Sequence, residues 1–110
     1  MQYESFKYTE KHEIEVLLAT GGSNTITDVL IGGVNGVDDR LWLEDVCLRY
    51  ISYPDYWVAK TAINSLGDIA RIYKEASENV ILALKSLNDD RLDGAVNTTL
   101  EDIIIFSNNS

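Results

Sequence analysis

The apolar residues of the chain recur three and four positions apart, which is the spacing of one face of an α-helix. The clearest short run consists of Leu43, Val46, Cys47, Tyr50 and Ile51, at i, i+3, i+4, i+7 and i+8. A longer stripe follows and predicts the strongest helix, with Val58, Ala62, Leu66, Ile69, Ala70 and Tyr73 on one face. These stripes predict an all-α fold of five or six helices without a sheet. The residues expected in its core include Val46, Val58, Ala62, Leu66, Leu84, Val96 and Leu100.

Glycines and capping residues set the expected ends of the first two helices. Thr9 is the expected N-cap of a first helix that stops at Gly21-Gly22. A second helix starts at Ser23 or Asn24, and the glycines within 32–36 predict that it is short and imperfect, because each costs about 1 kcal/mol in a helix interior. The aromatic residues before the first helix are expected to fold back on this hairpin, with a loose tail as the alternative; they are Tyr3, Phe6 and Tyr8.

Acidic residues and one proline mark the later helix starts. Asp38-Asp39 open the third helix, where negative charge suits the positive end of the helix dipole. Ser52 and Asp55 resemble a capping box for the fourth helix, and Pro54 suits its first turn. Ser77 begins a fifth helix. A sixth helix follows the turn at 88–90, and its expected apolar side comprises Leu92, Val96, Leu100, Ile103 and Ile104.

The last four helices contain a weak internal repeat. An offset of 34 residues pairs Val46 with Val80 and Leu66 with Leu100, and it holds across two helices and their turn. A constant offset of this length favours stacked helical hairpins. The expected organisation is a single domain, 1–110, divided into an irregular N-terminal hairpin, the best repeat and a C-terminal repeat; their ranges are 1–36, 38–74 and 77–106.

The net charge of −9 is concentrated in two segments. Residues 28–55 carry six acids against two arginines, and residues 89–102 carry five acids against one arginine, so each segment sums to −4. Such a charge disfavours direct binding to nucleic acid or to an anionic membrane surface. Two interpretations remain open: a solvated surface that keeps the chain soluble, and a docking face for a basic partner. The chain is expected to be cytoplasmic and monomeric when free.

The residues that carry most enzyme chemistry are scarce. His12 is the single histidine and is expected at the surface, while the single cysteine, Cys47, lies in an apolar stripe and is expected in the core. The chain has no Cys/His cluster with zinc spacing and no phosphate-binding loop. We therefore expect no catalytic site, no bound cofactor and no metal, and we interpret the protein as a non-enzyme.

The predicted turns supply the candidate interface. Hairpin turns of a helical repeat are exposed, and aromatic residues beside carboxylates suit an interface with Lys and Arg. Tyr56 is expected at the surface. Trp42 and Trp57 each lie one position off an apolar stripe, so core and interface both remain open for them. The candidate partner-binding residues are Asp38, Asp39, Trp42, Asp55, Tyr56, Asp89, Asp90 and Asp93.

Residues 48–62, followed by 66–72, resemble a HEAT-type helical repeat. In that family a first helix ends at a Pro-Asp turn, and the second helix opens with Val, a basic residue and Ala. Here Pro54-Asp55 matches the turn and Val58 the opening, but Ala59 follows directly and the basic residue is displaced to Lys60. The match is therefore good rather than strict.

The specific resemblance covers residues 43–72 and, weakly, 77–106. The whole chain also resembles short bacterial HEAT-like proteins, some of which are immunity proteins that neutralise a toxin domain delivered by a competing cell. The resemblance implies a short α-solenoid of five or six helices that binds a cognate protein toxin domain, with a basic nuclease as the expected type. The alternatives are a HEAT-like scaffold that binds a housekeeping protein and, third, an enzyme.

Overall fold

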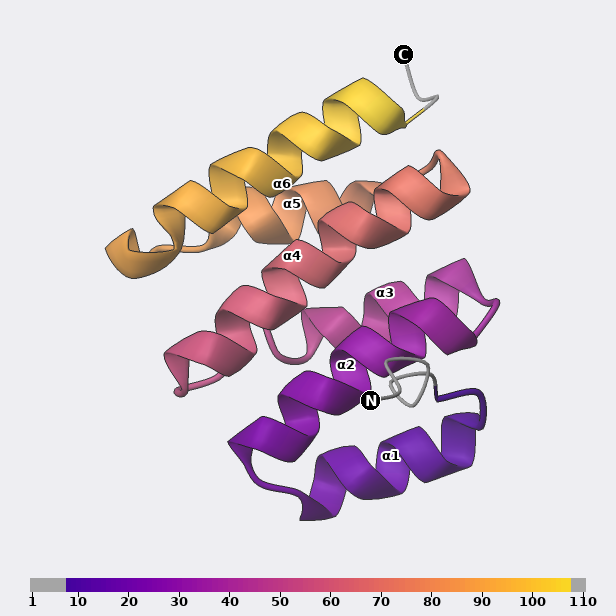
Figure 1. Cartoon of the computed structure of the whole chain (residues 1–110). Helices are drawn as coiled ribbons and strands as arrows, with labels where there is room; N and C mark the ends of the chain where they lie inside the picture. The colour runs from indigo at the N-terminus through magenta and orange to yellow at the C-terminus, as the bar shows by residue number, and fades with distance from the viewer. Residues whose placement is uncertain (1–7, 108–110) are drawn as a thin grey trace, which may run out of the picture.

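Six α-helices and one short 3₁₀-helix make up most of residues 8–107, which are the residues that the computed structural model describes (Figure 1). No strand occurs in this part of the chain, so the all-α prediction is confirmed. The helices are α1 (Lys11–Thr20), α2 (Ser23–Gly36), α3 (Arg40–Leu48), α4 (Tyr56–Tyr73), α5 (Glu78–Ser86), η2 (Asp90–Leu92) and α6 (Asp93–Phe106).

The longest helix, α4, has neighbours on three sides. It packs against α2, α3 and α6, and Figure 1 shows α2, α4 and α6 side by side in that order with α3 and α5 behind them. Helix α1 packs on α2 at one edge. None of the helices within residues 8–107 is both long and apolar enough to cross a bilayer.

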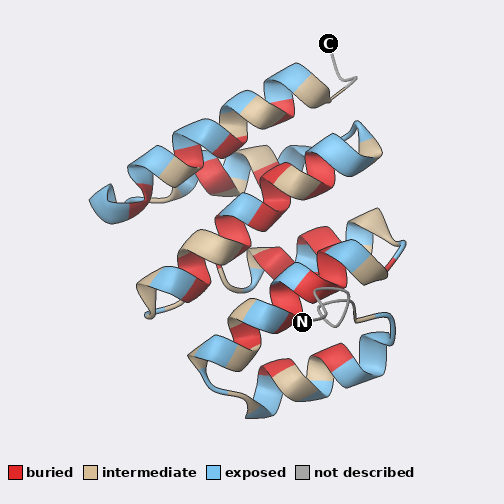
Figure 2. Cartoon of the chain, in the orientation of Figure 1, coloured by how far each residue is buried: buried red, intermediate tan, exposed pale blue. Residues whose placement is uncertain are grey.

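Helix α4 is buried over more than the single stripe that its sequence predicts (Figure 2). The stripe itself is confirmed from Val58 to Ala70, while Tyr73 is half-buried. A second row packs towards α6, where Gly67 leaves room for Thr99 and the Thr99 hydroxyl donates to the Ile63 carbonyl at 3.1 Å. The buried residues of α4 are Val58, Ala59, Ala62, Ile63, Ser65, Leu66, Gly67, Ile69 and Ala70.

The edge helix α6 is less buried than its sequence predicts. Val96 and Ile103 lie in the core, but Leu100 is half-buried and Ile104 is 78% exposed. Placing Ile104 on the apolar side was wrong, because α6 has protein on only the side that faces α4 and α5. The other predicted core residues are buried; they are Val46, Val58, Ala62, Leu66 and Leu84.

Helix α2 is not shortened by its glycines and runs through all 14 residues to Gly36. The chain before α1 packs against these glycines, and the Tyr8 amide donates to the Gly32 carbonyl at 3.0 Å. A Cβ atom on Gly36 would lie 2.8 Å from the Tyr8 carbonyl carbon, closer than real Cβ contacts allow. The contact offsets the low helix propensity of glycine. Tyr8 therefore folds back as expected, whereas Tyr3 and Phe6 lie outside the described residues.

Several helix starts differ from the predicted caps. The N-cap of α1 is Glu10 rather than Thr9, and it makes no side-chain cap. Asp55 is itself the N-cap of α4, so the box with Ser52 is not formed and Pro54 precedes the helix. Asp39 caps α3, in line with the predicted opening at 38–39.

Ser77 is the N-cap of α5, but its side chain is used for a tertiary contact instead of a cap. Its hydroxyl donates to Oε1 of the buried Glu44 at 2.6 Å, and its amide donates to Glu44 Oε2 at 3.1 Å. Arg40 also donates to this carboxylate, at 3.1 Å. Glu44 therefore connects α3 to the turn between α4 and α5. In the sequence it is one of the six acids of residues 28–55, and its burial there was not expected.

A pair of glycine substitutions tests the packing of Tyr8 on α2. Gly36→Ala is expected to destabilise the fold by about 1–3 kcal/mol, because the new methyl group meets backbone that has to shift. Gly33→Ala is the matched control: its Cβ would lie 3.5 Å from Ile14 Cδ1, an ordinary contact, and the gain in helix propensity is roughly 0.5–1 kcal/mol. Urea unfolding measures both. Equal effects of the two substitutions would contradict this packing.

Candidate interaction surface

The six candidate turn acids lie at opposite ends of α4 and do not form one surface. Asp38 Oδ1 accepts from the hydroxyl of Tyr73, the last residue of α4, at 3.2 Å. Asp55 caps the first turn of the same helix. Eighteen residues of helix span about 27 Å. Grouping Asp38 and Asp39 with Asp55 on sequence proximity is therefore not supported by the fold.

At the end where α4 starts, residues from two turns come together. The Arg91 guanidinium lies 5.7 Å from the centre of the Tyr56 ring. It also donates to both oxygens of Asp89, from Nε at 3.1 Å and from Nη2 at 2.8 Å. We call this region the aromatic end surface; it comprises Asp55, Tyr56, Trp57, Lys60, Asp89, Asp90, Arg91 and Asp93.

Trp57 is the largest apolar side chain that this surface presents to solvent. It is 65% exposed, so the possibility that it belongs to the core was wrong. Its ring meets that of the half-buried Tyr56 edge-on, with centroids 5.0 Å apart, and the Lys60 ammonium lies 5.3 Å from its centre. In the sequence, the exposure of Trp57 was indicated only by its position one residue off the buried stripe of α4.

Trp42, the other tryptophan, is half-buried at the opposite end of the molecule. It packs against the core, and the Lys11 ammonium lies 5.6 Å from its ring. Lys11 also pairs with Asp39 at 2.6 Å. The candidate residues therefore divide into two groups, with Asp38, Asp39 and Trp42 in one and the remaining five in the aromatic end surface.

Three of the six turn acids are helix caps. The carboxylate of Asp39 accepts from the Trp42 amide at 3.1 Å, and that of Asp89 from the Arg91 amide at 3.1 Å. Asp55 accepts from the amides of Trp57 and Val58, at 2.9 and 3.2 Å. These three carboxylates are thus already engaged within the fold, and a partner can use only their remaining lone pairs. Asp90 and Asp93 are exposed, and neither carboxylate accepts a hydrogen bond from another residue within 8–107.

The hydrogen-bond partners of these three caps lower the pKa of the carboxyl groups. For Asp39 the main cause is the hydrogen bond from Lys11, and for Asp89 it is the hydrogen bond from the Arg91 side chain, so both pKa values lie below 3.8. The pKa of Asp55 is lowered chiefly by the Val58 amide and then by Ser23. These groups favour the folded state while they are ionised.

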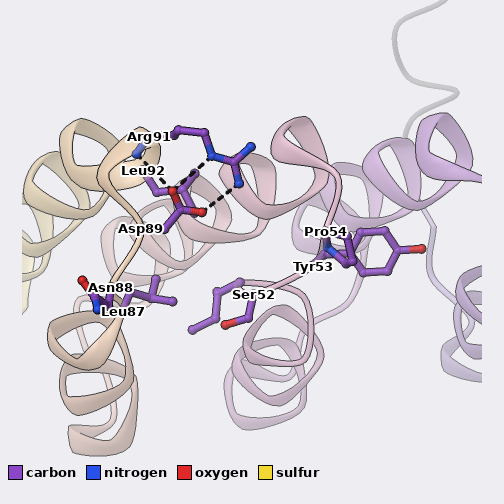
Figure 3. A pocket seen from close by; sticks show the side chains of 9 residues that line it. Ser52, Tyr53, Pro54, Leu87, Asn88, Asp89, Arg91 and Leu92 are labelled. Atoms are coloured by element: carbon purple, nitrogen blue, oxygen red, sulfur yellow. Dashed lines mark hydrogen bonds and ion pairs between the residues drawn. The ribbon is translucent and has the colours of Figure 1, made fainter.

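Two hollows adjoin on the aromatic end surface. The first, of about 270 Å³, lies between the 51–54 turn and the 87–92 turn, with the Asp89–Arg91 pair in its wall (Figure 3). Ile51, Pro54 and Leu87 give it an apolar side. The second, of about 360 Å³, lies between α4 and the start of α6. Its lining comprises Tyr56, Lys60, Asn64, Arg91, Gly94, Ala95 and Thr98, so that Arg91 belongs to both hollows.

The residues considered for catalysis lie away from these hollows. Cys47 is buried in the core as expected, and this burial raises the pKa of its thiol to about 12, which keeps it protonated. His12 is exposed on α1, as expected. Within residues 8–107 no three His, Cys, Asp or Glu side chains are grouped so that they could hold a metal ion. The arrangement at the aromatic end suits recognition of another molecule.

The caps predict a specific response to acid. A carboxyl group with a lowered folded pKa stabilises the fold fully above its unfolded value, near 3.8, and this stabilisation is lost as the pH falls through the lower folded value. Replacing Asp39, Asp55 and Asp89 together by Asn keeps acceptors at the caps but removes the titration. The variant should therefore lose less stability than wild type between about pH 4 and pH 2. Urea unfolding across this range checks it, and parallel curves would show that the caps do not titrate with folding.

Comparison with protein-family models, with curated proteins and with solved structures gave no match.

Proposed function

We propose that the protein is a binding module that neutralises a cognate toxin domain with a basic surface, in the manner of an immunity protein. The observation that carries the proposal is the exposure of Trp57 on the aromatic end surface, beside Tyr56 and the exposed acids Asp90 and Asp93. Tryptophan and tyrosine dominate the binding energy of protein interfaces. When a partner covers an exposed tryptophan, burial of its large apolar side chain contributes to the binding free energy.

We further propose that the fold is a short HEAT-like solenoid of stacked hairpins, with repeats at 38–74 and 77–106. The position of α4 between α2 and α6, with α3 and α5 behind, supports this arrangement. In a solenoid the turns of successive hairpins lie next to one another along one edge. The aromatic end surface is formed in this way by the turns before α4 and before α6.

The first hollow fits a basic side chain of the partner. The aliphatic stem of a lysine or arginine packs on Leu87 and Pro54, and its charged head reaches Asp89. The net charge of −9 raises the rate at which a basic partner arrives. A nuclease needs its basic surface to hold the nucleic-acid backbone, so covering that surface blocks the enzyme.

The central test looks for a toxin-domain gene directly upstream and then makes the substitution Trp57→Ala in cells that express that domain. We expect loss of protection and at least a roughly 30-fold weaker affinity, the scale of an interface hot spot. Leu41→Ala is the control: Leu41 is 62% exposed, similar to Trp57, but lies on α3. Affinity is measured by calorimetry and folding by circular dichroism. Protection that survives Trp57→Ala, or the absence of a toxin gene beside this one, would overturn the proposal.

A second test separates local charge from total charge. The double substitution Asp90→Lys with Asp93→Lys is expected to lower the association rate and to weaken binding most at low salt. Glu78→Lys with Glu101→Lys changes the net charge equally, and Glu78 matches Asp93 as an exposed acid in the first turn of a helix. Stopped-flow association over a salt series measures both variants. Equal effects would show that only the net charge matters and would reject docking at this surface.

A further inference from the structure

The second hollow has a local charge opposite to that of the molecule. Two cationic side chains line it, Lys60 from α4 and Arg91 from η2, and no carboxylate does. The amide of Asn64 and the hydroxyl of Thr98 add neutral hydrogen-bonding groups. In a chain with twice as many acids as bases, such a lining is unexpected.

Lys60 is the cation of this hollow that has no carboxylate partner in the described part of the chain. Its ammonium lies over the rings of Tyr56 and Trp57, at 5.8 and 5.3 Å, and it pairs with no carboxylate among residues 8–107. It is also half-buried. Arg91 uses Nε and Nη2 on Asp89, which leaves Nη1 for another acceptor. Both cations lie beside the Tyr56 ring, and both line this one hollow.

We propose that this hollow receives a carboxylate of the protein partner, the side chain of an Asp or Glu that lies within the partner's basic surface. This inference rests on the proposed function, because the partner brings the carboxylate. Lys60 and Arg91 bind its two oxygens, and Asn64 and Thr98 donate to them from the floor. The docking is thus reciprocal: a basic side chain enters the first hollow and an acidic one enters the second.

A carboxylate carried by a protein suits the hollow better than a free anion does. The exposed Asp90 and Asp93 near its rim, together with the net charge of −9, repel a small anion as it approaches. A carboxylate on a basic surface arrives with the surrounding lysines and arginines, for which the same acids are attractive. The hollow therefore selects a partner with a mixed charge pattern over one that is uniformly basic.

The test uses NMR titration of the isotope-labelled chain with two short capped peptides. One has Lys-Lys-Gly-Glu-Gly-Lys-Lys, and its twin has Gln in place of Glu. The Glu peptide should shift the amides of Gly94, Ala95 and Thr98 and bind roughly tenfold more tightly than its twin. Lys60→Met keeps the stem over the rings and should abolish that difference. Lys85→Met, at an exposed lysine in the last turn of α5, should preserve it.

A steric variant provides an independent arm. A Cβ atom on Gly94 would meet nothing within 4 Å, so the position accepts a side chain. Gly94→Leu adds a bulky group to the lining of the hollow and should also abolish the preference for Glu. Equal binding of the two peptides to wild type, or a preference that survives Lys60→Met, overturns the inference while docking of a basic partner stands. Failure of both peptides to bind would also overturn the inference, whereas the proposed function is tested separately by Trp57→Ala.

Discussion

Protein surrounds α4 on three sides, and this burial determines where every candidate interaction residue lies. A fully buried Val, Leu or Ile contributes roughly 1.5–3 kcal/mol, and α4 has four of them at 1% exposure or less. No other helix of the described residues has as many buried positions, so the remaining helices are arranged around this one. Its two ends in turn hold the two acidic turns about 27 Å apart.

The helices were predictable because their apolar stripes reflect a single strong requirement, the burial of one face. The apolar stripe of α4 and the short apolar run in α3 predicted the fold class and most of the core. Errors arose where a neighbour, rather than the local sequence, decides the outcome. Gly36 stays helical because Tyr8 packs on it, and Ile104 is exposed because no described element covers that side of α6. The Ser77 hydroxyl donates to Glu44 instead of capping its own helix.

The interaction surface was only partly predictable, because counting charges does not reveal their partners. The acids of the turns were found, but the sequence does not show that Asp39, Asp55 and Asp89 accept backbone amides. A negative net charge also does not show where the fewer positive side chains gather. Lys60 and Arg91 become significant only when the fold brings α4 and η2 to one hollow, and tertiary contacts of this kind have no local sequence signal.

Arg91 lies in the wall of both hollows, and this makes recognition at the two positions interdependent. A partner group that draws the guanidinium away from Asp89 alters the charge available in each hollow at once. Substitutions in the two hollows should therefore combine non-additively, as expected for residues that share a contact. Under the proposed function, one replacement at position 91 would alter the preferred charge pattern of the partner as a whole, so that specificity changes in a single step rather than through gradual weakening.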